Sequence, residues 1–309
     1  MTGSPTVARR IVVVVNAGSG QGSAETLADR VEAAFRAAGA PAEVRLARGG
    51  AELEATLDTA VAQRPDVIVA AGGDGTVSLV AAALVDEDIA LGVLPLGTLN
   101  HFAKDLGLPL EIEAAVAHVV HGRPMRVDVG EVNGRIFVNN SSLGLYPDIV
   151  RDRERQQRRL GRGKWPALVW ATLAALRRFP FLNVRLSVDG REQHWRTPFV
   201  FVGNNEYFME GFAIGARDGM QDGVLSLYVA QRPGRLRLLQ LALRALIGRL
   251  RQARDFSATR AAEIAVESRH HRLRVAVDGE VTVMTPPLLY RIRRASLQVL
   301  RAEPLSQNA

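Results

Sequence analysis

The chain contains no cysteine among its 309 residues. Disulfides, thiolate metal sites, cysteine nucleophiles and thiol redox chemistry are therefore excluded as a basis for its function. Lysine is also scarce, because Lys104 and Lys164 are the only lysines among 39 basic residues and the rest are arginines. At a net charge of +7, this composition favours partners that carry phosphate, namely a nucleotide, a nucleic acid or an anionic lipid. The alternative is that the excess of arginine reflects a compositional bias of the source genome.

Long hydrophobic runs are missing as well. The longest candidate, residues 165–176, ends at Arg177 and is shorter than the ~20 apolar residues that span a bilayer. The first ten residues hold no apolar segment of the signal-peptide type. We therefore expect a cytoplasmic protein, soluble or peripherally bound to a membrane. We expect no nucleic-acid binding, because no basic patch is interleaved with aromatic residues that stack on bases.

The overall composition is that of a globular protein of about two domains, with 47% apolar and 23% charged residues. In the first part of the chain, short apolar runs alternate with glycine turns and amphipathic stretches. The pattern predicts strands at 11–15, 43–46, 66–71 and 89–94, and helices at 23–38, 52–63 and 77–84. This repetition of strand, loop and helix predicts a parallel sheet with helices on its faces.

The pattern changes near Arg126, where strands and hairpin turns begin to alternate. The dipeptides Asn133-Gly134 and Asp189-Gly190 are typical of type I′ turns. Further strands are expected at 198–202, 224–230, 262–266 and 273–285, and helices at 165–177 and 234–254. We therefore predict an α/β domain at residues 1–125 and an antiparallel β domain with helical insertions at 126–294. The tail, 295–309, is a candidate to return to the first domain.

Three glycine-containing loops, at 16–22, 72–76 and 95–98, follow buried strands of the first domain. In open α/β sheets ligands bind outside the carboxyl ends of the strands, where glycines let the backbone approach phosphate and helix N-termini supply N–H groups. None of the loops has the Gly-Lys-Ser/Thr of a P-loop, and the first lacks the third glycine of a dinucleotide fingerprint. The loops predict a phosphate site of another type.

Asp74 lies among the glycines of the second loop. A carboxylate next to nucleotide phosphates is unfavourable unless a cation lies between them, so its position predicts Mg²⁺ held by carboxylate, phosphate and water oxygens. The alternative is that Asp74 only caps the helix predicted at 77–84.

Taken together, the loops resemble those of the diacylglycerol kinase catalytic family, whose relatives include the sphingosine, ceramide and NAD kinases. Residues 72–76 read Gly-Gly-Asp-Gly-Thr, which matches the family signature. Residues 16–20 and 96–103 resemble its first and third loops, and 278–280 match its late Asp-Gly-Glu. The third loop followed by this late motif resembles the bacterial lipid kinase branch.

The resemblance implies a nucleotide-binding α/β domain, a β-sandwich domain that binds the substrate, and an active site in the cleft between them. It implies a kinase that uses ATP and Mg²⁺ to phosphorylate a lipid hydroxyl, that of diacylglycerol or a related glycerolipid. The residues implied in ATP binding come from all three loops: Asn16, Ser19, Gly20, Gly72, Gly73, Asp74, Gly75, Thr76, Gly97, Thr98 and Asn100.

The same resemblance implies the catalytic and metal residues. Glu280 or Asp278 would take the proton from the lipid hydroxyl, with Glu280 favoured, and Asp74 would belong to the catalytic metal site. A structural Mg²⁺ would be held by the Asp222 side chain and the carbonyls of Val224 and Gly219. One departure is His101, which stands where the family usually has aspartate.

Several alternatives remain open at this point. Residues 275–283 also form a plain hairpin pattern that turns at Asp278. A soluble-metabolite kinase of the NAD kinase type and a catalytically silent nucleotide- or membrane-binding relative are rival functions. The apolar stretches at 165–176 and 234–254 favour a lipid.

The basic segment 151–164, with seven basic residues directly before Trp165, favours an anionic membrane surface as a partner. A solvated loop is the simpler explanation of this segment. A homodimer is also possible.

Overall fold

The computed structural model describes residues 9–18, 24–144, 181–207, 217, 219–230 and 256–301. Contacts between Cα atoms divide the chain into two compact units, Met1–Val127 with Ala295–Ala309, and Asp128–Arg294. The helices predicted at 165–177 and 234–254 and the basic segment 151–164 lie outside the described residues. Among the described residues, no helix is long and apolar enough to cross a bilayer.

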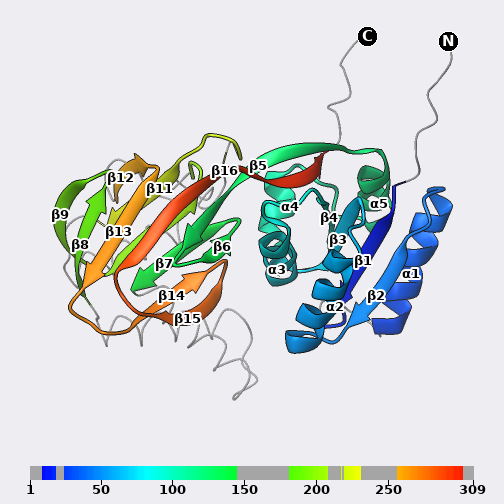
Figure 1. Cartoon of the computed structure of the whole chain (residues 1–309), viewed down its shortest axis with the longest axis horizontal. Coiled ribbons are helices and arrows are strands. Elements are labelled where there is room, and N and C mark those ends of the chain that lie inside the picture. Colours follow the sequence, from blue (N-terminus) through cyan, green and yellow to red (C-terminus); the bar gives the residue numbers. More distant parts are fainter. Residues whose placement is uncertain are drawn as a thin grey trace, which may run out of the picture. The chain divides into compact units, whose positions relative to one another are not determined.

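The first unit is built on a parallel sheet of β1 (Ile11–Asn16), β2 (Glu43–Ala47), β3 (Val67–Gly72) and β4 (Ala90–Pro95). The strands are ordered β2-β1-β3-β4, and the end of β16 (Leu288–Arg301) adds a further parallel strand beside β4 (Figure 1). Strands β3 and β4 are buried along their whole length, which explains their continuous apolar runs. The predicted parallel sheet is confirmed.

Helices cover this sheet. α1 (Ala24–Ala37) and α5 (Ile112–His121) share one apolar core with the strands, while α2 (Gly50–Ala62) and α3 (Asp74–Leu84) pack on each other and against β1 and β3. The short α4 (His101–Asp105) and α5 are absent from the sequence prediction. α3 begins at Asp74, three residues before the predicted start, because the glycine loop leads directly into its first turn.

The second unit holds antiparallel strands in two sheets. One sheet contains β16, β13 (Glu263–Ser268), β8 (Leu182–Val188) and β9 (Arg191–Thr197), with β5 (Arg123–Val132) beside β16 and β6 (Arg135–Phe137) beside β5. The other has the order β12 (Phe256–Ala261), β11 (Leu225–Ala230), β10 (Phe199–Asn204), β7 (Asn140–Gly144), β14 (Leu273–Val277) and β15 (Glu280–Met284).

A single apolar core joins these two sheets into a sandwich. Every second residue of β8, β10 and β14 contributes to the core, as the period of a half-buried strand requires. The Tyr290 hydroxyl lies 3.1 Å from the Ser141 hydroxyl inside it, and burial raises the pKa of Tyr290 above its usual range.

Three tight turns of this unit share one construction. Asn133, Asp189 and Asp278 each have φ near +45° and each precedes a glycine that also has positive φ. This is the type I′ geometry that Asn-Gly and Asp-Gly favour. The stretch 273–285 is accordingly the hairpin β14–β15, in which Val277 pairs with Glu280.

Candidate functional site

The loops after β1, β3 and β4 lie at one edge of the sheet, because these neighbouring strands are parallel. A hydrogen bond joins the first two loops, with Asn16 Nδ2 donating to Thr76 Oγ1 at 2.9 Å. Asn16 Oδ1 also accepts the backbone N–H of Gly18 at 3.0 Å. The structure therefore brings the predicted residues of the first and second loops together. Ser19 and Gly20 lie outside the described residues.

The second and third loops approach so closely that only glycine fits. A Cβ on Gly97 would lie 2.6 Å from the Gly73 Cα and 2.8 Å from Asn100 Oδ1. A Cβ on Gly72 would lie 2.4 Å from Thr76 Oγ1. These separations are shorter than real Cβ contacts, so a side chain at Gly97 would force the second and third loops apart, and one at Gly72 would displace Thr76 within the second loop.

Asp74 links the same two loops through its carboxylate. Oδ2 accepts the backbone N–H of Asn100 at 3.0 Å, and Oδ1 accepts that of His101 at 2.7 Å. Asp74 therefore bonds N–H groups at the start of α4, while its own helix α3 has Gly73 as N-cap and no side-chain cap bond. The capping alternative considered for Asp74 applies to α4 instead of α3.

Asn100 fixes the shape of the third loop. Its backbone is left-handed, with φ of 51°, and its side chain accepts from Gly97 N at 3.0 Å while donating to the carbonyls of Pro95 and Gly97. Asn100 is buried, whereas Gly75 of the second loop and Thr98 of the third loop are exposed. The three loops are thus joined by hydrogen bonds, and Gly75 and Thr98 lie on the exposed side of this edge.

This edge is chemically suited to a phosphate chain. The first turn of α3 supplies N–H groups without intrahelical partners and the positive end of a helix dipole. Each Asp74 oxygen accepts one hydrogen bond and retains a second lone pair, so the carboxylate still fits a Mg²⁺ ion or its bound water.

The predicted structural metal turn lies in the second unit. The Asp222 carboxylate folds over Gly219, where an added Cβ would lie 2.8 Å from Asp222 Oδ1. The carbonyl of Val224 accepts the backbone N–H of Asn205 at 2.9 Å and has a second lone pair. The buried Asp128 holds this turn, since its Oδ2 accepts the N–H of Gly223 at 2.7 Å.

One carboxylate and two carbonyls form an all-oxygen donor set of the kind that Mg²⁺ prefers, with water completing the shell. The described residues hold no cluster of three or more His, Asp or Glu side chains able to bind a metal ion.

Both carboxylate oxygens of Asp278 accept hydrogen bonds from the backbone. Its Oδ1 accepts the N–H groups of Asn139 and Asn140 at 2.8 and 3.0 Å, and its Oδ2 accepts that of Val138 at 2.9 Å. Its own N–H donates to the Asn140 carbonyl at 2.8 Å. Asp278 therefore ties the β14–β15 turn to the segment between β6 and β7.

Glu280, the second carboxylate of the predicted Asp278-Gly279-Glu280 motif, is exposed. Its side chain is 63% exposed, and its Oε2 lies 2.6 Å from the NH2 nitrogen of Arg135. Sequence reasoning missed Arg135. Arg135 and Glu280 share only their place in the sequence, each directly after an Asn-Gly or Asp-Gly dipeptide, and this alone does not pair them.

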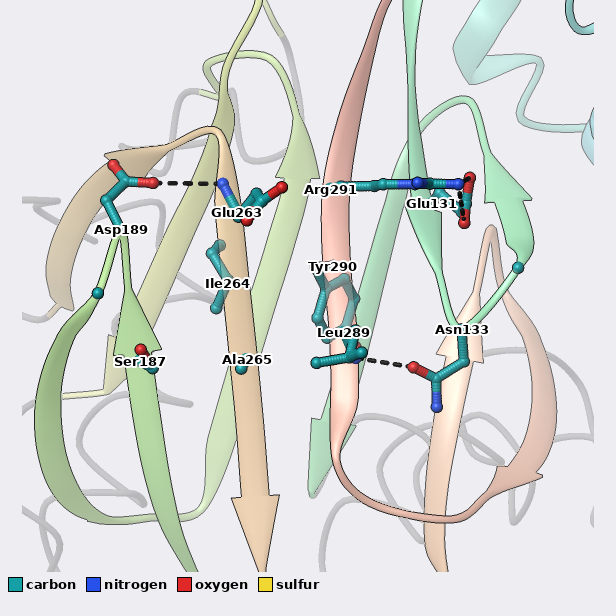
Figure 2. Close-up of a pocket in the computed structure, with 12 residues that line it drawn as sticks. Glu131, Asn133, Ser187, Asp189, Glu263, Ile264, Ala265, Leu289, Tyr290 and Arg291 are labelled. Atoms are coloured by element: carbon teal, nitrogen blue, oxygen red, sulfur yellow. Dashed lines mark hydrogen bonds and ion pairs between the residues drawn. The ribbon is translucent and has the colours of Figure 1, made fainter.

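A separate groove of about 530 Å³ lies on the second unit, across β5, β16, β13 and β8 (Figure 2). Its polar side chains are largely bonded within the protein: Asp189 accepts the N–H of Glu263, Asn133 accepts that of Leu289, and Arg291 pairs with Glu131. Glu131 also bonds Arg293, and its hydrogen bond to Arg291, together with its charge, raises the pKa of Arg291. None of the predicted site residues lines this groove.

Comparison with known proteins places these features in context. Residues 10–132 match the family model described as the diacylglycerol kinase catalytic domain, and residues 148–301 match the YegS C-terminal NAD kinase beta sandwich-like domain. A protein of Mycobacterium tuberculosis named diacylglycerol kinase is 31% identical over 301 residues, covering 94% of this chain and 95% of the relative.

Two further comparisons agree with these. A Bacillus subtilis protein with the same name is 28% identical over 247 residues, covering 78% of this chain and 80% of the relative. A crystal structure described as a diacylglycerol kinase from Bacillus anthracis superposes with a TM-score of 0.69 at 20% identity, covering 96% of this chain and 98% of that one. At that identity the superposition establishes the fold, including the β-sandwich of the second unit.

Proposed function

Since the chain belongs to the diacylglycerol kinase catalytic family and is a phosphotransferase of the lipid-kinase type, we propose that it transfers the γ-phosphoryl group of ATP to the hydroxyl of diacylglycerol with the help of Mg²⁺. The observation that carries this proposal is the joined edge of three loops, in which Asn16 bonds Thr76 and Asp74 bonds the third loop. Such an edge offers N–H donors for phosphate and a carboxylate for the cation.

In the proposed reaction the lipid hydroxyl oxygen attacks the γ-phosphorus. The new bond joins that oxygen to phosphorus, the bond between the γ-phosphorus and the bridging oxygen breaks, and ADP leaves with the bonding electrons. The hydroxyl proton passes to the carboxylate of Glu280 and then to solvent. Glu280 suits this role because it is exposed and its Oε1 is left open by the contact that Arg135 makes with Oε2.

The ATP phosphates would lie against the N–H groups of the Gly72–Thr76 and Gly97–Thr98 loops, with Asn16 and Thr76 holding the first two loops in register. Bound Mg²⁺ would supply neutralisation of the phosphate charge as the bond to ADP breaks. Asp74 would orient that ion, while Asp222 and the carbonyls of Gly219 and Val224 would hold a second, structural Mg²⁺.

The assay that tests this function is transfer of label from γ-labelled ATP across a panel of lipids, with NAD as a further acceptor. Label in diacylglycerol that requires Mg²⁺ supports the proposal. Label in NAD instead favours the soluble-metabolite kinase, and absence of transfer to every acceptor favours a silent nucleotide-binding relative.

A lipid substrate stays in the bilayer, so the proposal includes peripheral docking of a cytoplasmic enzyme on an anionic membrane. The sequence feature that supports docking is the basic segment 151–164 before Trp165. Co-sedimentation with liposomes should rise with phosphatidylglycerol content and fall with salt. Binding that is unchanged after charge reversal of Arg158, Arg159 and Arg162 would contradict this docking site.

A further inference from the structure

Two hairpins of the second unit meet through the residue that follows each turn. Arg135 is the first residue of β6 after the turn at Asn133-Gly134, and Glu280 is the first residue of β15 after the turn at Asp278-Gly279. The Arg135 NH2 nitrogen and Glu280 Oε2 are 2.6 Å apart. Arg135 is the only side chain among the described residues that forms an ion pair or hydrogen bond with the Glu280 carboxylate.

Stability alone does not account for this contact. The two side chains are 41% and 63% exposed, and ion pairs at such exposure contribute little to folding. What the contact does fix is a rotamer, because a glutamate side chain at the edge of a hairpin otherwise samples several. The contact engages Oε2 and leaves Oε1 open.

The turn that carries Glu280 is fixed separately. Asp278 accepts three backbone N–H groups of residues 138–140, which follow β6 directly. The backbone N–H of Asp278 bonds the same segment. Thus β6 and the chain after it hold the second hairpin at two points, the turn through Asp278 and the carboxylate through Arg135.

We propose that Arg135 and Asp278 are positioning residues for Glu280: Asp278 sets the place of the turn, Arg135 sets the direction of the carboxylate, and Glu280 alone accepts the proton. This inference rests on the proposed function and assigns a separate role to each of the three residues. Asp278 is assigned no proton transfer, because a proton on its carboxylate would weaken the three backbone hydrogen bonds that hold the turn in place.

The test compares Arg135→Met and Arg135→Lys in the labelled-ATP assay on vesicles of phosphatidylglycerol with diacylglycerol. We expect Arg135→Met to lower kcat by about 2- to 5-fold with little change in the KM for ATP, because an exposed ion pair can bias the Glu280 rotamer by no more than its own free energy. Arg135→Lys should recover most of the loss, since the contact uses a single nitrogen donor. The matched control is Arg185→Met, because Arg185 of β8 forms exposed ion pairs with Glu192 of β9 and Glu267 of β13 and none with the β14–β15 hairpin.

A double-mutant cycle separates positioning from a general structural effect. In the Glu280→Gln background, Arg135→Met should cause no further loss of kcat, because the group it orients no longer accepts a proton. Independent losses that multiply would overturn the positioning role. Unchanged kcat in Arg135→Met alone would do the same.

Asp278→Asn distinguishes the two carboxylates. In this variant an amide NH₂ group replaces one carboxylate oxygen and faces the N–H of Val138 or Asn139, which then has no acceptor. We therefore expect a lower unfolding temperature together with lower activity. Glu280→Gln should lose activity at an unchanged unfolding temperature. If Glu280→Gln stays active while Asp278→Asn is inactive and fully stable, Asp278 is the base and the proposal is wrong. If the wild-type protein is inactive on every lipid, the proposed function itself is wrong. If the wild type is active and Arg135→Met has unchanged kcat, only the positioning role is wrong.

Discussion

The backbone N–H of His101 donates a 2.7 Å hydrogen bond to the carboxylate of Asp74. This bond joins the glycine loop after β3 to the start of α4, and it uses the main chain of position 101, so any residue there except proline can form it. The histidine that stands in place of the usual family aspartate therefore leaves the link between the loops intact. The replacement changes only the side chain presented at that edge, which weakens the argument for a silent relative.

Asp74→Ala should abolish turnover. We expect kcat to fall by at least about 10²-fold, because the carboxylate that orients the phosphate-bound cation is lost. The free energy of unfolding should also fall by about 1–2 kcal/mol, since the N–H groups of Asn100 and His101 lose their acceptor. Asp58→Ala on the exposed side of α2 is the control. Retention of a tenth of wild-type kcat would remove Asp74 from the catalytic site.

Gly97→Ala and Gly73→Ala form a graded pair at one contact. A Cβ on Gly97 would lie 2.6 Å from the Gly73 Cα, whereas a Cβ on Gly73 would lie 3.4 Å from the Gly97 Cα, an ordinary contact distance. We therefore expect Gly97→Ala to cost about 1–3 kcal/mol of stability and to raise the KM for ATP about 10-fold. Gly73→Ala should have a much smaller effect on both. Equal effects in the two variants, measured by urea unfolding and ATP titration, would show that loop spacing is not the determinant.

Sequence patterns were sufficient for the parallel strands and for the glycine edge. Strands buried on both faces, such as β3, appear as continuous apolar runs, and each is followed by a glycine loop. α5 is absent from the sequence prediction although Ile112, Ala115, Val116 and Val119 have helical spacing, because it is only 10 residues long and has no side-chain cap at its start.

The pairing of Arg135 with Glu280 depends on the meeting of two hairpins 145 positions apart, which no local pattern specifies. The same is true of Asp278. Its Asp-Gly dipeptide predicts a turn, but the three N–H groups it accepts come from a distant segment. Only these long-range contacts distinguish the backbone-bonded Asp278 from the exposed Glu280.

The proposed structural Mg²⁺ site predicts that Asp222→Asn removes a stabilising effect of Mg²⁺ on the second unit. A ligand that binds only the folded state raises the unfolding temperature with its concentration. We expect MgCl₂ to raise the unfolding temperature of the wild type and to have a much smaller effect on Asp222→Asn, with Asp189→Asn as the control at another exposed turn. Equal responses of the two variants in a thermal shift measurement would place the ion elsewhere.

Acid pH should destabilise the first unit through His118. This side chain of α5 lies against the end of β16, with Nε2 3.3 Å from the Leu300 carbonyl. Burial lowers the pKa of His118 below its ordinary value of 6.5, and the charge of Arg301 acts in the same direction, while the bond to Leu300 opposes them.

Because the folded-state pKa of His118 is the lower one, the unfolded chain takes up the proton first as the pH falls. The stabilisation is therefore complete above about pH 6.5 and is lost as the pH falls through the folded-state pKa. The unfolding temperature of the wild type should fall between about pH 7 and pH 5 more steeply than that of His118→Gln. His121→Gln, at an exposed position on the same helix, should keep the wild-type slope. If His118→Gln and the wild type lose stability in parallel over this range, the pH dependence comes from other groups.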